Sequence, residues 1–462
     1  MKKKILIVGS GSRENALAWK LSQSPRVGKI FIAPGNPGTA RFSENLNINA
    51  TDINALIEFA QKNAADLTVV GPEDPLALGI VDAFLKQGLK IWGPSKAAAQ
   101  IESSKTFAKE LMKKNNIPTA EFETFSNYNE AIKYVETKGA PIVIKASGLA
   151  LGKGVTICKT LDEAKGALKA AMVDKVFGDS GSEVVIEEFL EGMEFSAHAF
   201  CDGKTFKMLP FSQDHKKIFD GDQGPNTGGI GTIAPLPWTT DELINQVSEK
   251  IVQPTLEGLK NLSSPFTGLL YPGLMATGSP SFLKRGTGGV KVIEFNCRFG
   301  GPECESYMRI LKTDLLDILE ACVQGTLDKM KIEWHPLFAC CIILCSKGYP
   351  DKYDKGFPIT GIEAAEKMED VVVFHAGTAY SSSPPLFQKG GQGGVITNDL
   401  SAKALATAGG RVLGVTATGN DLKSALNKAY AAVKLIHFEG MHYRGDIGQK
   451  SLFLLNTKGA KY

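Results

Sequence analysis

The stretch Lys291-Val292-Ile293-Glu294-Phe295-Asn296-Cys297-Arg298-Phe299-Gly300-Gly301-Pro302-Glu303 decides how this chain is interpreted. Its alternation predicts a short strand over residues 291–295, so Glu294 and Asn296 project from the same face. Both offer hard oxygen ligands, which suit Mg²⁺ or Mn²⁺ held together with nucleotide phosphates. Arg298 follows as a fixed cation for a phosphoryl or carboxylate group. The pattern indicates phosphoryl transfer, although an exposed strand with ordinary surface charges would look the same.

The composition is that of a globular protein with enough apolar residues for a large core. Of 462 residues, 43% are hydrophobic and 22% are charged, and this length predicts about three domains. With 52 Lys+Arg against 49 Asp+Glu, we expect neither a nucleic acid nor a membrane as partner. The eight cysteines are scattered without metal-binding spacing, so a reducing cytosol, and hence a cytoplasmic location, fits best.

A strand, a glycine turn and a helix follow each other at the start of the chain. Residues 5–8 are apolar, and Gly9-Ser10-Gly11-Ser12-Arg13-Glu14 leads into a helix over residues 15–21. This order places backbone N–H groups and a helix dipole where an anion can bind. A dinucleotide site is rejected because Glu14 stands at the third glycine position and no ribose-binding acid follows the second strand. The alternatives are a single phosphate contacted by Arg13 and a tight turn that binds nothing.

Two further strand-to-loop units predict a doubly wound parallel sheet at the N-terminus. A strand over residues 29–33 ends at Pro34-Gly35-Asn36, and a strand over residues 67–70 ends at Gly71-Pro72-Glu73. A ligand lies at the carboxyl ends of the strands in such sheets, so both loops should meet the first glycine turn there.

The middle of the chain combines lysines with a glycine-rich connection. A strand over residues 140–145 ends in Lys145 and leads into Ala146-Ser147-Gly148-Leu149-Ala150-Leu151-Gly152-Lys153-Gly154, and a helix over residues 102–116 carries Lys105 in its first turn. The spacing is wrong for a Walker loop, so we interpret the connection as a flap between two strands that closes over phosphates. A hairpin with one surface lysine is the alternative.

Strands and a helix also alternate in the C-terminal third, where they predict a small α/β unit. Apolar strands are expected over residues 338–344, 370–375 and 410–415, and an amphipathic helix over residues 418–435. The stretch 381–399 is rich in Ser, Pro and Gly, which is typical of a loop.

These segments together resemble the ATP-grasp fold and, more narrowly, the family of phosphoribosylamine–glycine ligases. The likeness to the fold rests on Lys105, the flap from Lys145 to Gly154, Glu187-Glu188-Phe189-Leu190, and Glu294-Phe295-Asn296-Cys297-Arg298. Motifs similar to those of the ligases run nearly end to end: Gly9-Ser10-Gly11, Ala33-Pro34-Gly35-Asn36, Val70-Gly71-Pro72-Glu73, Ser212-Gln213-Asp214-His215-Lys216, Gly224-Pro225-Asn226-Thr227-Gly228-Gly229, Tyr443-Arg444 and Asp446-Ile447-Gly448.

The resemblance implies an α/β fold with an α+β ATP-grasp core. It places a doubly wound, substrate-binding domain at residues 1–103, an ATP-grasp domain at 104–332 with a mobile subdomain at about 123–193, a small α/β cap at 333–448, and a tail at 449–462. It also implies an enzyme of purine biosynthesis that joins glycine to 5-phosphoribosylamine through glycyl phosphate, with ATP as co-substrate and Mg²⁺ or Mn²⁺ as cofactor. Fusion or association with other enzymes of that pathway is a further expectation, because two segments look like the branch in which such fusions occur.

The resemblance assigns a role to each matching residue. ATP would be bound by Lys105, Lys145, Gly152, Lys153, Gly154, Glu187, Glu188, Leu190 and Glu194, and the metal by Glu294 and Asn296. The catalytic residues would be Arg298, Asp214 and Lys216. Glycine and 5-phosphoribosylamine would be bound by Gly11, Arg13, Glu14, Gly35, Asn36, Gly71, Glu73, His215, Asn226, Thr227 and Gly228.

The chain departs from the family pattern at several positions. The family usually has His at Asn15, Gly-Gly at Gly11-Ser12, Ala at Pro272, Asp at Gly301 and Gln at Glu305. Gly301 removes a carboxylate expected beside Arg298, so three hypotheses stay open. They are an active ligase, an ATP-grasp carboxylate–amine ligase with altered acceptor or amino-acid specificity, and a nucleotide-binding pseudoenzyme.

Overall fold

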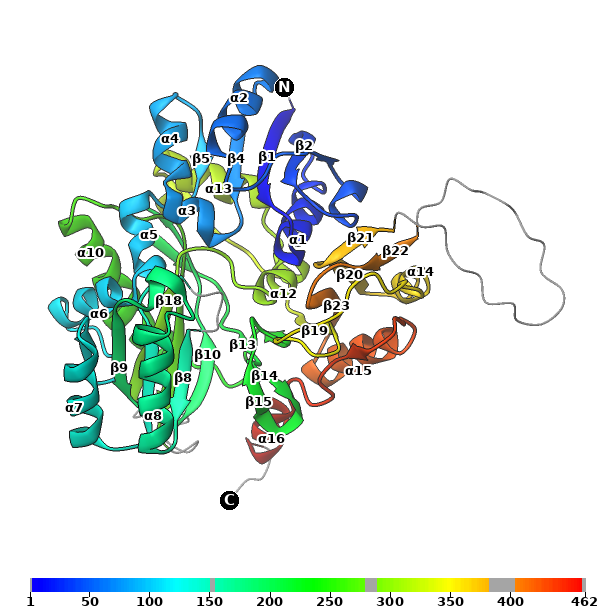
Figure 1. The fold of residues 1–462 in the computed structure, drawn as a ribbon. Helices are drawn as coiled ribbons and strands as arrows, with labels where there is room; N and C mark the ends of the chain where they lie inside the picture. Colours follow the sequence, from blue (N-terminus) through cyan, green and yellow to red (C-terminus); the bar gives the residue numbers. More distant parts are fainter. Residues whose placement is uncertain (1, 150–153, 279–288, 382–403, 459–462) are drawn as a thin grey trace.

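The N-terminal part of the chain forms a parallel sheet whose strand order reverses at β1. The computed structural model describes residues 2–149, 154–278, 289–381 and 404–458. The N-terminal sheet contains β1 (Lys3–Gly9), β2 (Val27–Pro34), β3 (Glu44–Asn45), β4 (Leu67–Val70) and β5 (Ile91–Trp92), in the order β3-β2-β1-β4-β5. Ile5 to Val8 of β1 are fully buried, as expected for a parallel strand covered on both faces. The carboxyl ends of β1 and β4 therefore flank the switch point where ligands bind in such sheets (Figure 1).

Two helices occupy the region where the sequence predicts one over residues 102–116. Helix α5 (Lys96–Ser103) ends before Ser104, whose backbone is extended with φ −138° and ψ 106°, and α6 (Lys105–Lys114) then begins. The Ser104 hydroxyl accepts a hydrogen bond from the backbone N–H of Phe107 and caps α6. The helix predicted over residues 102–116 is therefore confirmed over Lys105–Lys114, with Lys105 in its first turn, but it begins later than predicted because Ser104 caps a helix start better than it continues a helix.

The flap sheet is antiparallel and has a hydrophobic core of its own. It contains β6 (Phe122–Phe125), β9 (Val184–Glu188), β7 (Ile142–Ala146) and β8 (Val155–Cys158), in that order, and lies beside α7 (Tyr128–Lys138) and α8 (Leu161–Leu168). Its core includes Ile144, Ile186 and Leu168 and is separate from the two larger clusters of buried residues. Lys145 pairs with Val155, so the glycine-rich connection joins two antiparallel strands, as predicted.

The strand that carries Glu294 lies in the central sheet. This sheet contains β10 (Met193–Ser196), β17 (Thr267–Thr277), β11 (Ala199–Asp202) and β12 (Phe206–Met208), and β18 (Gly289–Asn296) pairs with β17. Glu294 lies opposite Gly273, and Asn296 lies opposite Tyr271. The strand predicted over residues 291–295 is confirmed, and it is longer at both ends.

The C-terminal sheet combines strands from the middle and the end of the chain. Its strands are β13 (Gln213–Asp214), β16 (Gly231–Ala234), β19 (Phe338–Ser346), β23 (Arg411–Gly419) and β20 (Val371–His375), in that order, with β24 (Met441–His442) on β19. Helices α12 (Glu303–Ile310) and α15 (Leu422–Val433) pack against it. Asp214 and Arg411, which are far apart in sequence, thus belong to one sheet (Figure 1).

The C-terminal helix α15 and the cysteines follow the predictions from the sequence. The predicted inner face of α15 is buried, including Leu422, Leu426 and Val433. The eight cysteines are buried and none forms a disulfide. Within the described ranges, no helix is long and apolar enough to cross a membrane. Most of the loop predicted over residues 381–399 lies outside the described residues.

Candidate active site

A cavity of about 870 Å³ opens between the N-terminal, flap, central and C-terminal sheets. Most of the site residues implied by the resemblance line it: Gly11, Arg13, Glu73, Lys105, Lys145, Gly154, Glu187, Glu188, Leu190, Glu194, Asp214, His215, Lys216, Asn226, Thr227, Gly228, Glu294, Asn296 and Arg298. Gly152 and Lys153 lie outside the described residues. The remaining four are not among the lining residues: Glu14 belongs to α1 (Ser12–Leu21), and Gly35, Asn36 and Gly71 belong to the loops after β2 and β4.

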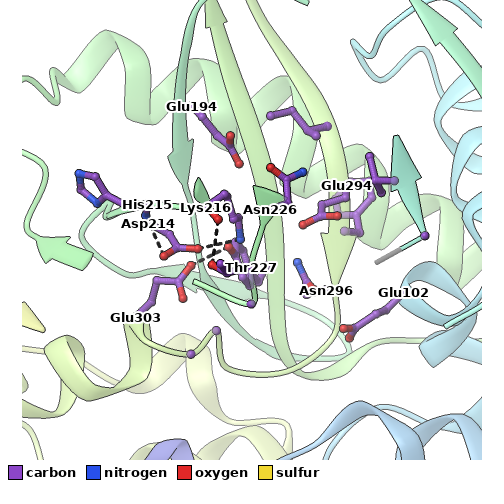
Figure 2. Close-up of a pocket in the computed structure, with 18 of the residues that line it drawn as sticks. Glu102, Glu194, Asp214, His215, Lys216, Asn226, Thr227, Glu294, Asn296 and Glu303 are labelled. Atoms are coloured by element: carbon purple, nitrogen blue, oxygen red, sulfur yellow. Dashed lines mark hydrogen bonds and ion pairs between the residues drawn. The ribbon is translucent and has the colours of Figure 1, made fainter. Parts of the chain in front are cut away.

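Glu294 and Asn296, the two residues predicted to bind a metal ion, lie at the end of β18. Burial disfavours the charge of Glu294, but Lys216, Lys145 and Lys105 outweigh it and lower the pKa of this carboxyl, so it is ionised. Figure 2 shows both side chains on one side of the cavity. Among the described residues, no group of three or more His, Cys, Asp or Glu side chains could hold a metal ion. The donor set therefore fits a hard cation that takes its remaining ligands from phosphates and water.

Buried lysines surround Glu187 at the base of the flap sheet. Its carboxylate lies 3.2 Å from Nζ of Lys109 and 3.0 Å from Nζ of Lys145, and all of these side chains are at most 4% exposed. Lys145 also donates to the carbonyl of Ile293 (2.8 Å), and Lys105 donates to the carbonyl of Gly148 (3.2 Å). Burial lowers the pKa of Lys109 to about 8. Glu187 is thus bound to lysines and positions them.

Lys109 was missed by the sequence analysis, although a signal existed. It follows Lys105 by four residues on α6, so both lysines lie on one face of the helix.

Two other acids, Glu188 and Glu194, are predicted to bind ATP together with Glu187. Glu188 forms an ion pair with Lys291 and accepts a hydrogen bond from the backbone N–H of Glu121. Glu194 lines the cavity, and burial raises its pKa to about 7.

Asp214, Lys216 and Glu303 face Glu294 from the other side of the cavity (Figure 2). Nζ of Lys216 lies 2.8 Å from Oδ2 of Asp214, whose pKa burial raises to about 6 despite the lysine. Glu303 begins α12 and accepts hydrogen bonds from the hydroxyls of Tyr271 (2.6 Å) and Ser196 (3.0 Å). Glu303 was missed because an acid in the first turn of a helix is ordinary.

His215 and Thr227 line the cavity but use their polar atoms on the backbone. Nδ1 of His215 donates to the carbonyl of Gly231 (3.0 Å), and Nε2 accepts from the N–H of Gly448 (3.1 Å). Burial lowers the pKa of His215 to about 4, so the ring is neutral. The Thr227 hydroxyl donates to the carbonyl of Lys216 (2.8 Å).

Arg298 is clamped between two carboxylates. Its Nε lies 3.1 Å from Glu73, and its Nη2 lies 2.7 Å from Glu102 and donates to Oδ1 of Asn296 (2.9 Å). Burial alone would raise the pKa of Glu73, but Arg298 and Arg13 lower it to about 2. Glu102 was missed because its partners lie far along the chain, and it also accepts from the N–H of Cys297 (2.7 Å).

The N-terminal loops are held together by their own polar side chains. Glu14 accepts hydrogen bonds from Nε of Arg13 (2.8 Å) and from the N–H of Gly11 (2.5 Å). The amide of Asn36 donates to the carbonyls of Ser10 (2.7 Å) and of a residue on β20. A Cβ on Gly71 would lie 2.0 Å from Oε1 of Glu14, so a side chain there would displace this carboxylate.

Gly301 lies beside a different arginine from the one that the sequence analysis expected. Its carbonyl accepts a hydrogen bond from Nη1 of Arg411 (2.7 Å), whereas Arg298 is occupied by Glu73 and Glu102. A Cβ on Gly301 would meet nothing within 4 Å, so this position opens into the cavity. Arg411 was missed because only the C-terminal sheet brings it to the cavity.

Comparison with known protein families supports a relationship along most of the chain. Three sequence models match: Phosphoribosylglycinamide synthetase, N domain, at residues 3–102; Phosphoribosylglycinamide synthetase, ATP-grasp (A) domain, at 103–304; and Phosphoribosylglycinamide synthetase, C domain, at 339–450. The phosphoribosylamine–glycine ligase of Ralstonia nicotianae is 46% identical over 451 residues, which cover 97% of this chain and 99% of the relative. The same enzyme of Caldanaerobacter subterraneus is 45% identical over 444 residues, which cover 96% and 99%.

Solved structures agree with this relationship. The phosphoribosylamine–glycine ligase of Thermotoga maritima superposes with a TM-score of 0.78 at 32% identity, covering 96% of this chain and all of the other. The N5-carboxyaminoimidazole ribonucleotide synthetase of the same organism has a TM-score of 0.58 at 20% identity, covering 94% and 99%. The second likeness concerns the fold alone.

Replacing Glu305 by Gln should stabilise the protein at neutral and alkaline pH. Burial raises the pKa of this carboxyl from 4.5 to about 7 in the folded chain. The free energy of unfolding is therefore highest below pH 4.5 and falls between pH 4.5 and about 7. In this range the unfolded chain releases the proton of Glu305, whereas the folded chain keeps it. The loss should reach about 3 kcal/mol. Urea unfolding should show the Glu305→Gln gain at pH 8 and almost none at pH 4.5, whereas Glu257→Gln, an exposed control, should show none. An equal gain at both pH values would contradict this explanation.

Proposed function

The chain belongs to the phosphoribosylglycinamide synthetase family, and we propose that its cavity joins glycine to 5-phosphoribosylamine with ATP as co-substrate. The observation that carries the proposal is the meeting of three groups in one cavity. They are the oxygen pair Glu294 and Asn296, the buried lysines of the flap side, and the Asp214–Lys216 pair opposite. The product is glycinamide ribonucleotide, an intermediate of purine biosynthesis.

The reaction needs alignment and charge neutralisation more than covalent help. The carboxylate of glycine attacks the γ-phosphate of ATP, which gives ADP and glycyl phosphate. The nitrogen of 5-phosphoribosylamine then attacks the carbonyl carbon, phosphate leaves, and the nitrogen loses a proton. Glycyl phosphate hydrolyses in water, so an enclosed cavity that holds both partners favours the second step.

ATP is proposed to lie between the flap sheet and the central sheet. Lys105 and Lys145 face its phosphates, and Lys109 supports them through Glu187. Glu194, Glu188 and Leu190 line the part of the cavity where adenosine fits. Glu294 and Asn296 would hold Mg²⁺ or Mn²⁺, which supplies positive charge to the phosphates when it is bound.

The reacting atoms are proposed to lie between Arg298 and the Asp214–Lys216 pair. Glu73 and Glu102 fix the guanidinium of Arg298, so its charge is aimed at the transferring phosphoryl group without reorganisation. Asp214 is suited to take the proton that the attacking nitrogen loses, because burial raises its pKa to about 6, close to the working pH. Lys216 lies within ion-pair distance of this carboxylate and stabilises its charge.

Other proposals follow from the same family membership. We propose the boundaries 1–103, 104–332 and 333–448 for the domains, with a subdomain at about 123–193 that moves when ATP binds. We also propose a cytoplasmic location and an association with other enzymes of the pathway. Limited proteolysis with and without Mg²⁺ and ATP would test the boundaries and the motion.

The direct test of the function is ADP release by the purified chain. With Mg²⁺ and ATP, release should require both glycine and 5-phosphoribosylamine generated in situ, and mass spectrometry should detect glycinamide ribonucleotide. Release with glycine alone, or with another amine or amino acid in preference, would favour a ligase of altered specificity. ATP binding without any turnover would refute the proposal.

The metal pair should be essential for turnover. Glu294→Gln keeps the shape of the side chain but removes the charge that holds the cation, so kcat should fall by about a hundredfold or more. The Mg²⁺ concentration for half-maximal rate should rise at the same time. The exposed Glu257→Gln variant is the control and should keep both values. Unchanged kinetics of Glu294→Gln would show that the cation is held elsewhere.

A further inference from the structure

Most positive charges in the cavity already have a carboxylate partner. The lining cations with a carboxylate oxygen within 4 Å are Arg13, Lys109, Lys145, Lys216, Arg298 and Lys450. Among the described residues, no such partner exists for Lys105, Lys217 and Arg411. Lys105 belongs to the ATP side, beside Gly148 at the start of the flap. Lys217 lies on the hairpin of β14 (Lys217–Phe219) and β15 (Gln223–Asn226).

Arg411 is the first residue of β23 in the C-terminal sheet and lines the cavity. Its Nη1 donates to the carbonyls of Gly228 and Gly301, which hold the guanidinium in place. Within the described part of the chain, no hydrogen bond is formed by its Nε or Nη2. Gly301 leaves open space next to this cation, because a Cβ there would meet nothing within 4 Å. The result is a fixed guanidinium that lines the cavity beside open space and has no carboxylate oxygen within 4 Å among the described residues.

The N-terminal turn lies on the same side as Arg411. Helix α12, which carries Glu305, connects the two because it packs against both α1 (Ser12–Leu21) and β23. The obvious cation of the turn, Arg13, is paired with Glu14, and the N–H of Gly11 is also bonded to Glu14. The turn therefore needs another cation to bind a doubly charged phosphate.

We propose that Arg411 binds the phosphate group of 5-phosphoribosylamine and thereby sets the specificity for a phosphorylated acceptor. The inference rests on the proposed function and concerns one substrate. The phosphates of ATP are assigned to Lys105 and Lys145. The carboxylate of glycine is the nucleophile and must lie at the γ-phosphate. The acceptor phosphate is the remaining anion, and a planar guanidinium with free N–H groups is suited to bind it in a bidentate manner.

The test compares ribose 5-phosphate with ribose as ligands of the full chain, by titration calorimetry. The native chain should bind ribose 5-phosphate more tightly than ribose. Arg411→Met should weaken the binding of ribose 5-phosphate by about ten- to a hundredfold, since a charge-assisted pair is lost. It should leave ribose binding and the affinity for Mg²⁺ and ATP unchanged. The matched control is Lys217→Met, which removes another unpaired cation of the same cavity and should change neither affinity by more than about threefold.

Two outcomes would overturn the proposal. One is an Arg411→Met chain that binds Mg²⁺ and ATP normally and ribose 5-phosphate as tightly as the native chain. The other is an equal loss in Lys217→Met, which would indicate a general effect of charge. Should Arg411→Met lose ATP binding through misfolding, Arg411→Lys decides. Lysine keeps the positive charge but lacks the paired N–H groups of a guanidinium. A loss of ribose 5-phosphate affinity of threefold or more would support the proposal, and an unchanged affinity would refute it.

The turnover assay separates this proposal from the proposed function. A native chain that forms glycinamide ribonucleotide, while Arg411→Met or Arg411→Lys keeps the native KM for 5-phosphoribosylamine, would refute the role of Arg411 alone. A native chain that binds ribose 5-phosphate through Arg411 but forms no product would refute the ligase function and leave the phosphate site standing.

Discussion

The clamp of Arg298 between Glu73 and Glu102 is the interaction on which the geometry of the site depends. Glu73 is the first residue of α3 (Glu73–Leu78), which follows β4 of the N-terminal sheet in the sequence. Glu102 belongs to α5, and Arg298 follows β18 of the central sheet. Glu102 is buried and the other two side chains are partly buried, so each charge is costly to desolvate unless its partner is present. The clamp thus fixes the edge of the N-terminal sheet against the end of β18, where Asn296 faces the cavity.

The same principle explains why the cavity can hold so many charges before a substrate arrives. Glu187 compensates two lysines, Glu14 compensates Arg13, and Asp214 compensates Lys216. Each carboxylate lowers the cost of burying its cation and holds it at a fixed position. The site is therefore preorganised, and substrate anions meet charges that need little reorganisation. Among the described residues, Arg411 differs from these cations, because its guanidinium is held by backbone carbonyls and not by a carboxylate within 4 Å.

Local patterns in the sequence predicted the parts of the site that short-range geometry controls. Alternation put Glu294 and Asn296 on one face of a strand, and the strand–turn–helix pattern put Gly11 at an edge of the N-terminal sheet; the structure agrees with both. Spacing did not reveal Glu102, Glu303 or Arg411, because their partners lie in distant segments. Local patterns also could not show that polar groups of Asn36 and His215 bond to backbone atoms that only the folded chain brings near.

The C-terminal part of the chain is more than a cover for the cavity. Strand β13 carries Asp214 and is joined through β16 and β19 to β23, which begins with Arg411. A continuous ladder of hydrogen bonds therefore sets the spacing between the group proposed to accept a proton and the group proposed to hold the acceptor phosphate. The flap sheet, with its separate core, belongs to a different layer of the molecule. Movement of that layer over ATP would leave the Asp214–Arg411 spacing unchanged. The proposed site for the acceptor phosphate and the proposed site for the nucleotide therefore depend on different sheets of the molecule.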